Sequence, residues 1–483
     1  MTTIESHWQD LLMGGNTQGV PHVNFARFVA EVNGDALRYS PEVGWLGWTG
    51  KVWERQPDEA PVFQAMTTAA KTLLRAFTEP GGQTWHQEAG NVLLRTNHRV
   101  YIARELKGMR GVRARLNEFD RHPHLLTFQN GTVDLRTGEL QPHNPRDMLT
   151  HITNVSYVPD ASAPVFAEFL RGAHPQDNGI REYLRTLIGY GITGENREHA
   201  FAIWYGQHGR NGKGTLIRAL KAAFGPDLIM DVDFSVFEKG SGAHTEAIAR
   251  LKHARIVTAS EGSEGVPLDA EMLKRHAGGD AISARHLHGA VFEYVPQYLI
   301  VLLSNHLPEF RTSGPALWSR VRAVEFTQSF AANPDRALDA KLRGELEGIA
   351  AWAVRGAVDY YREGLTSPEA VEATTRDHKE KVNPLAEMIG DLFEFDADAK
   401  TKRSDFNREL KEWKANNGYP SAKFQPAWVK TRLGESGMIE KTVKGTRYYA
   451  GVRLTPEHGG PVQVPDNLAG IDSASRDVFG QGR

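Results

Sequence analysis

The chain has 483 residues, of which 40% are hydrophobic and 24% are charged, as is usual for a globular protein. Its length predicts about two to four domains, and its lack of cysteine excludes disulfides and Cys-ligated zinc or iron–sulfur sites. The net charge of −2 argues against a protein that coats DNA through an overall basic surface, but it is compatible with a local basic surface. The sequence has no apolar run of membrane-spanning length and starts with polar and acidic residues, so we expect an intracellular protein without a membrane partner.

Turn signals and apolar spacing predict a mixed α+β region in the first third of the chain. Helical spacing occurs over 62–78 and 98–117, and the alternating stretch 125–140, with its Asn-Gly and Thr-Gly pairs, predicts a hairpin. Three tryptophans within residues 45–53 could stack on nucleotide bases, but we favour the aromatic core of a small sheet. The 19 histidines show no H-E-x-x-H spacing, so we expect most of them to be surface or polar-core residues rather than metal ligands.

A glycine-rich loop is the central motif of the chain. It follows the apolar run Ala202–Tyr205 and precedes a helical pattern, so it predicts a strand, a phosphate-binding loop and a helix. The match to G-x-x-x-x-G-K-[ST] departs at Gln207, which replaces the first glycine, and at Gly214, which replaces the hydroxyl residue. Taken alone, a glycine turn before a core helix would be a serious rival interpretation. The candidate nucleotide-binding residues are Gly209, Asn211, Gly212, Lys213, Gly214 and Thr215.

Two later apolar runs end in polar residues that suit nucleotide hydrolysis. The run Ala254–Ser260 predicts a strand that carries Glu261 to the carboxyl edge of a sheet, where it would activate the attacking water. The run Tyr298–Leu303 predicts a fully buried parallel strand leading to Asn305, which would contact the γ-phosphate or the water. For Asn305, a role limited to turning the chain before Pro308 remains the alternative.

Basic residues around these strands are candidates for contacts with anions. The segment 273–294 is rich in Lys, Arg and His, and its second half predicts a hairpin; it could be a solvated face or a loop that grips DNA phosphates. Arg320 and Arg322 lie on or beside a predicted strand, where they could pair with Glu325 or act as an arginine finger.

Together these residues resemble the superfamily 3 helicase ATPases of the phage and plasmid primase–helicase family, a branch of the AAA+ fold that also includes poxvirus primase–helicases. The resemblance covers most of residues 25–455. The motifs that carry it are Gly209–Thr215, Ala259–Glu261, Lys274–Arg285, Leu303–Pro308 and Trp318–Arg320.

The resemblance implies an α/β fold with an AAA+ P-loop ATPase core and a C-terminal winged-helix domain. The expected parts are a flexible N-terminus (1–20), the family's N-terminal α+β region (21–164), a helical collar or linker (165–198), the ATPase core (199–330), a helical connection (331–384), the winged-helix domain (385–455) and a flexible tail (456–483).

The resemblance also implies a ring, usually a hexamer, that hydrolyses ATP with Mg²⁺ and moves 3′ to 5′ along single-stranded DNA. Lys213 would bind phosphate, Glu261 would activate water, Asn305 would sense the γ-phosphate, and Arg320, with Arg322 as the alternative, would act across the subunit interface. Thr215 is the candidate Mg²⁺ ligand. The residues expected to face DNA are Lys274, Arg285, His286 and His288.

This resemblance implies a replicative helicase of a phage, prophage or plasmid. The helicase would act on single-stranded and forked DNA in the cytoplasm of a bacterial host. Only about 165 residues precede the ATPase, without a paired-carboxylate motif for polymerisation, so we expect no primer synthesis and a primase or polymerase encoded separately. Residues 401–455 hold 12 Lys and Arg against 5 Asp and Glu, which independently indicates a nucleic-acid partner. The alternatives are an ATP-binding DNA initiator or scaffold with little turnover, and another DNA motor ATPase such as a packaging enzyme.

Overall fold

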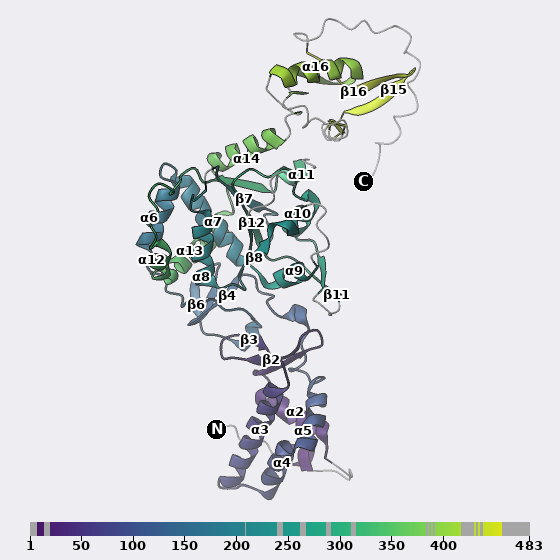
Figure 1. The fold of residues 1–483 in the computed structure, drawn as a ribbon. Coiled ribbons are helices and arrows are strands. Elements are labelled where there is room, and N and C mark those ends of the chain that lie inside the picture. Colours follow the sequence, from purple (N-terminus) through teal and green to yellow (C-terminus); the bar gives the residue numbers. More distant parts are fainter. Residues whose placement is uncertain are drawn as a thin grey trace. The chain divides into compact units, whose positions relative to one another are not determined.

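The computed structural model divides into two compact units (Figure 1). The first unit comprises Met1–Glu309 and Ser319–Thr375, and the second comprises Phe310–Trp318 and Arg376–Arg483. None of the helices in the described residues is long and apolar enough to cross a membrane. The structure describes residues 7–13, 20–207, 209–238, 245–260, 267–285, 291–310, 315–382, 385, 388–389, 392–416, 429–430, 433–434 and 438–455.

The first unit begins with a group of helices that share one apolar core. These helices are α1 (His7–Met13), α2 (His22–Asn33), α3 (Ala60–Thr78), α4 (Thr84–Leu94) and α5 (Thr96–Leu106). Trp8 and Leu12 of α1 are four residues apart, so they lie on one helix face, and both are buried in this core. The structure thus has a helix at His7–Met13, within the stretch 1–20 that was expected to be a flexible N-terminus. The helical pattern expected over 98–117 ends at Leu106, where α5 ends.

A small antiparallel sheet lies between α2 and α3 in the chain, with the strand order β1 (Leu37–Ser40), β2 (Gly44–Trp48) and β3 (Trp53–Arg55). Trp45 and Trp53 are buried, and the ring of Trp48 lies 5.7 Å from that of Trp53, which is its register partner. These contacts confirm that the three tryptophans form part of the core of a small sheet.

The predicted hairpin over 125–140 is confirmed as the start of a three-stranded antiparallel sheet. Its strands are β4 (Leu125–Phe128), β5 (Gly131–Asp134) and β6 (Glu139–Gln141), flanked by the 3₁₀ helices η1 (Leu116–Glu118) and η2 (Pro145–Asp147). The chain then enters α6 (Pro164–Ala173) and α7 (Asn178–Thr193). Asp177 caps α7 by accepting a hydrogen bond from the Ile180 amide at 2.9 Å, and Gly194 ends the helix in the left-handed region.

A five-stranded parallel sheet forms the centre of the first unit, with the order β13-β7-β12-β9-β8. The strands are β7 (Phe201–Tyr205), β8 (Ile229–Asp233), β9 (Ile256–Ser260), β12 (Leu299–Ser304) and β13 (Val321–Glu325). Every residue of β7 is buried, as are all of β12 except Ser304, because helices and loops cover both faces of a central parallel strand. The strands expected from the apolar runs before Gly206, Glu261 and Asn305 are thereby confirmed.

Helices and short segments connect these strands. They are α8 (Lys213–Phe224), η3 (Phe234–Phe237), α9 (Thr245–Arg250), η4 (Leu251–His253) and α10 (Ala270–Ala277). The helices α12 (Leu338–Arg343) and α13 (Leu346–Glu363) follow β13. The strands β10 (Ile282–Arg285) and β11 (Val291–Tyr294) pair antiparallel, which confirms the two arms of the hairpin expected within 273–294. Residues of α7, α8 and α13 pack with Trp204 and Val301 of the central sheet in one apolar core.

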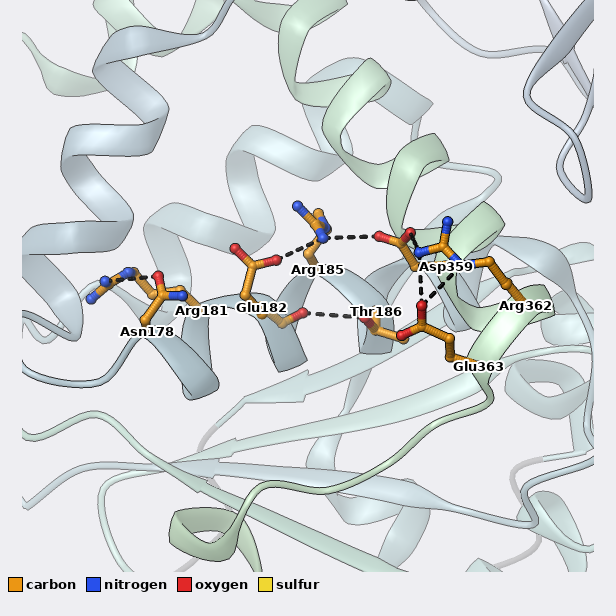
Figure 2. A network of polar contacts seen from close by, with 8 residues as sticks. All are labelled: Asn178, Arg181, Glu182, Arg185, Thr186, Asp359, Arg362 and Glu363. Carbon is orange, nitrogen blue, oxygen red and sulfur yellow. Dashed lines mark hydrogen bonds and ion pairs between the residues drawn. The ribbon is translucent and has the colours of Figure 1, made fainter.

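Helices α7 and α13 cross at a contact between two glycines. A Cβ on Gly189 would lie 2.1 Å from the carbonyl carbon of Gly356, and a Cβ on Gly356 would lie 2.1 Å from the Arg185 carbonyl oxygen. Figure 2 shows the Arg185 side chain between carboxylates of both helices, at 2.6 Å from Glu182 and 2.9 Å from Asp359. The close backbone approach and the ion pairs together hold α13 against α7.

The second unit combines two distant parts of the chain. The helix α11 (Pro315–Trp318) lies between β12 and β13 in the sequence but belongs to this unit, where the Trp318 ring is 5.1 Å from His378 and 5.6 Å from Phe310. His378 lies on α14 (Glu369–Val382), which contains the boundary between the units.

The rest of the second unit is a three-stranded antiparallel sheet with a helix. The elements are β14 (Phe393–Lys402), α16 (Arg403–Asn416), β15 (Ile439–Val443) and β16 (Thr446–Leu454). Lys444 and Gly445 both have positive φ, as a tight turn between β15 and β16 requires. The Phe406 ring of α16 packs 4.9 Å from Tyr449 of β16. The winged-helix assignment of residues 385–455 stays a prediction.

We expect Gly356→Ala to lower the free energy of unfolding by about 1–3 kcal/mol, because the new methyl group would overlap the Arg185 carbonyl and force α13 away from α7. Gly108→Ala is the control, since a Cβ there would lie 3.7 Å from the nearest atom and φ is not in the left-handed region. Denaturant unfolding measures both. Equal stability of the two variants would contradict the glycine contact.

Candidate functional site

The glycine loop connects β7 to α8 at the carboxyl edge of the central sheet. Gly212 has φ +92° and ψ −12°, in the left-handed region, and leads directly into α8. A Cβ on Gly206 would lie 2.1 Å from Asn211 Nδ2 and 2.5 Å from the Phe326 carbonyl oxygen, whereas a Cβ on Gly209 would meet no atom within 4 Å. The close approach that the loop requires is therefore made by Gly206, one residue before the pattern position that Gln207 occupies.

Lys213 begins α8 and is buried, with 6% of its surface exposed. Its Nζ donates to Asn211 Oδ1 at 2.8 Å and to Asn305 Oδ1 at 3.4 Å, and Asn211 Nδ2 donates to the Phe326 carbonyl at 3.3 Å. Two amide oxygens thus hold the ammonium group at the start of a helix, where the backbone N–H groups also point outward. The site presents concentrated positive potential to a ligand.

A pocket of about 1050 Å³ lies in front of this loop. Ser260, at the end of β9, and Ser304 and Asn305, at the end of β12, form part of its wall. Parallel strand ends around a glycine loop and a helix N-terminus make a site suited to phosphate groups. The sequence-predicted residues that the structure brings together in this pocket are Gly209, Asn211, Gly212, Lys213, Gly214, Thr215 and Asn305.

Another wall of the pocket was missed by the sequence analysis. It contains the Phe169 and Phe330 rings, whose centroids are 6.5 Å apart, and the Phe330 amide donates to the Arg210 carbonyl at 3.0 Å. No local pattern distinguishes these residues, because tertiary packing brings α6 and the segment after β13 to the loop. The charged residues on this side are Glu168, Arg171, Asp335 and Lys341.

Thr215 lies in the first turn of α8 and lines the pocket. Its Oγ1 accepts a hydrogen bond from Arg218 Nη2 at 3.1 Å, and the same nitrogen donates to Asp339 Oδ1 at 3.2 Å. A threonine hydroxyl has two lone pairs, so this oxygen can still bind a cation. A Cβ on Gly214 would lie 3.2 Å from Arg218 Nη1, so the end of this flexible side chain would have to shift slightly to admit one.

The strand β9 ends at Ser260, and the predicted catalytic residue Glu261 lies outside the described residues. The register partner of Ser260 on β8 is Asp233. Its Oδ1 caps η3 by accepting a hydrogen bond from the Ser235 amide at 2.8 Å, and Asp233 does not line the pocket.

Arg320 immediately precedes β13 and therefore lies at the amino edge of the sheet. Its guanidinium donates to the Lys274 carbonyl, and its own carbonyl accepts from the Phe201 amide at 2.9 Å. The pocket is at the opposite edge, and the five residues of β13 put the two ends on the order of 13 Å apart. Arg322 Nη1 donates to the Ser319 and Val321 carbonyls at 2.7 and 3.0 Å. Neither arginine lines the pocket of its own chain.

Of the residues predicted to face DNA, Lys274 and Arg285 lie on described elements of the first unit. Lys274, on α10, forms an ion pair with Glu271 at 2.5 Å, and Arg285 is exposed at the end of β10. His286 and His288 lie outside the described residues. His276, in the same basic segment, is buried against the Tyr298 hydroxyl at 2.6 Å, and burial lowers its pKa to about 4. It is neutral at pH 7 and adds no positive charge to this surface.

Comparison with known proteins supports part of the family resemblance. Residues 26–175 match the family described as D5 N terminal like. A putative helicase of Acanthamoeba polyphaga mimivirus is 27% identical over 348 residues, which cover 66% of this chain and 36% of the viral protein. A putative helicase of Invertebrate iridescent virus 3 is 26% identical over 224 residues, which cover 44% of this chain and 24% of the relative. The chain thus spans about a third or less of these relatives.

Among solved structures, an apo structure of the NrS-1 C-terminal region is similar with a TM-score of 0.38 and 12% identity. The similar region covers 62% of this chain and 78% of that one. A second apo structure of the same region has a TM-score of 0.37 and 13% identity.

Gly206→Ala should lower the free energy of unfolding by about 1–3 kcal/mol, because the methyl group would displace the Asn211 amide from the Phe326 carbonyl. Gly209→Ala, in the same loop, has open space and should change stability by less than about 0.5 kcal/mol. Thermal and denaturant unfolding of both variants without nucleotide checks this. A stability loss in Gly209→Ala as large as in Gly206→Ala would refute the assigned role of Gly206.

Proposed function

We propose that this protein is an ATP-dependent replicative DNA helicase of a phage, prophage or plasmid, built around a superfamily 3 AAA+ core. The observation that carries the proposal is the buried Lys213 ammonium held between the Asn211 and Asn305 oxygens in the pocket in front of the glycine loop. The helicase names of the viral relatives support the choice of reaction. The domain boundaries expected from the sequence, including the winged-helix domain at 385–455, are part of the same proposal.

The residues of the pocket fit a nucleoside triphosphate with a divalent cation. Its volume of about 1050 Å³ matches the upper range of ligand pockets, and the loop amides, the α8 N-terminus and Lys213 all present positive charge. Mg²⁺, when bound, would neutralise phosphate charge. The Thr215 hydroxyl, with water, would hold this ion. Asn305 would position the γ-phosphate, and Glu261 would orient and deprotonate the attacking water.

The DNA-facing part of the proposal assigns Lys274, Arg285, His286 and His288 to the pore of a hexameric ring that moves 3′ to 5′ on single-stranded DNA. The excess of Lys and Arg in residues 401–455 supports a further contact with forked DNA. We place the protein in the cytoplasm of a bacterial host. Primer synthesis is assigned to a separately encoded primase or polymerase.

The first test is ATP hydrolysis by the purified chain with and without single-stranded DNA. We expect DNA to stimulate turnover, and Lys213→Ala to reduce it on the order of 100-fold, because the buried ammonium group beside the glycine loop is lost. Lys221→Ala is the matched control, since Lys221 lies on the same helix but forms an ion pair with Asp231. ATP and DNA binding without stimulated turnover would instead favour the initiator or scaffold function.

A second test concerns Arg320, which lies at the sheet edge away from the pocket of its own chain. Rings made only of Arg320→Ala subunits, or only of Lys213→Ala subunits, should not hydrolyse ATP. A mixture of the two variants should regain ATP hydrolysis, because the intact pocket of an Arg320→Ala subunit can then lie beside the intact Arg320 of a neighbouring Lys213→Ala subunit. Mixtures with Arg322→Ala serve as the comparison. Recovery that depends on Arg322 alone, or no recovery in any mixture, would contradict the assignment of Arg320.

A further inference from the structure

Three side chains with metal-binding atoms come together in the first unit, outside the nucleotide pocket. They are Asp120, His151 and His253, and one ligand atom of each lies within 4.8 Å of those of the other two. His253 Nδ1 is 3.4 Å from Asp120 Oδ2, and the two imidazole rings have centroids 4.7 Å apart. Within the described part of the chain, no other group of three such residues meets this distance.

A small cavity of about 20 Å³ lies beside this cluster and is lined by all three residues. A volume of this size accommodates about one water molecule or one ion. The Nε2 atom of His151 is buried and has no hydrogen-bond partner among the described residues. A buried polar atom without a partner costs about 1–3 kcal/mol. A ligand bound at this nitrogen would remove that cost.

The Asp120 carboxylate is fixed in place by its neighbours. Its Oδ1 accepts a hydrogen bond from the Thr150 amide at 2.9 Å, and its Oδ2 accepts one from the Thr150 hydroxyl at 2.6 Å. Such hydrogen bonds orient carboxylates that bind metal ions in proteins. Arg255, two residues after His253, also lines the cavity, and its Nη1 donates to the Thr193 carbonyl.

We propose that Asp120, His151 and His253 bind one Zn²⁺ ion, with a water molecule from the cavity as the fourth ligand. Two imidazoles and one carboxylate form a ligand set that zinc accepts in tetrahedral geometry, at about 2.0–2.2 Å from each donor atom. The present separations of up to 4.8 Å contract on binding through rotation of the imidazole side chains. These histidines are thus exceptions to the expectation that the histidines are not ligands.

The positions of the three ligands indicate a structural role for the ion. Asp120 and His151 lie within residues 26–175, whereas His253 ends η4, which Ala254 and Arg255 connect to the strand β9 that reaches the pocket. The zinc would link the N-terminal region to the central sheet across more than 100 residues of sequence. This inference is independent of the helicase activity proposed above, and none of the three residues lines the pocket in front of the glycine loop.

The test measures zinc binding by the 483-residue chain. We expect about one Zn²⁺ per chain after dialysis against zinc-free buffer, and a drop in zinc affinity of at least about tenfold in His151→Asn and in His253→Asn, measured by competition with a chromogenic chelator. His124→Asn is the control, because His124 lies on the same segment as Asp120 but outside the cluster. Co²⁺ in place of Zn²⁺ should give the visible absorption of a tetrahedral site in the parent protein and the control.

The two histidine variants separate zinc binding from folding. The His253 side chain is 32% exposed, so His253→Asn should fold even if His151→Asn does not. Zinc should raise the melting temperature of the parent protein and of His124→Asn, with a smaller shift in His253→Asn. The proposal is overturned if the parent protein holds no zinc, or if His253→Asn binds zinc as tightly as the control does.

Discussion

The candidate site depends on the hydrogen bonds of one side-chain amide, that of Asn211. Its nitrogen donates to the Phe326 carbonyl just after β13, and its oxygen accepts from Lys213. This arrangement joins the glycine loop, the first residue of α8 and the adjacent edge strand. It exists because Gly206 has no side chain at the point where Asn211 passes. The position of the buried ammonium group, and so the electrostatic character of the pocket, follows from this packing.

The parallel sheet gives that arrangement a rigid frame. β7 is bonded to β13 on one side and to β12 on the other, so the loop, Phe326 and Asn305 all extend from neighbouring strand ends. On the opposite edge, the Arg320 carbonyl is bonded to Phe201, the first residue of β7. The same two strands therefore carry Arg320 at one end and the Asn211 contacts at the other. Because protein interiors are barely compressible, a displacement of β7 and β13 at the Arg320 end would also move their ends at the Asn211 contacts.

Much of this frame was predictable from the sequence, whereas several parts of the site were not. β7, β9 and β12 are continuous apolar runs, as buried parallel strands must be, and the turn residues of the 125–140 sheet have specific backbone requirements. The motif spacing also placed Lys213 and Asn305 together. By contrast, Trp8 and Leu12 were overlooked because a glycine-rich stretch follows them. The Phe169 and Phe330 wall depends on long-range packing that leaves no local pattern.

Because the two units alternate along the chain, they cannot be separated by a single truncation. The chain enters the second unit at Phe310, returns to the first at Ser319 and leaves it again after Thr375. Phe310 and Trp318 pack with His378, which is encoded about 60 residues later. Deleting the chain after Thr375 would remove this partner and expose two large aromatic rings within the segment that connects β12 to β13. A truncated fragment ending there would expose an apolar surface that favours aggregation, and that aggregation would not reflect a property of the untruncated chain.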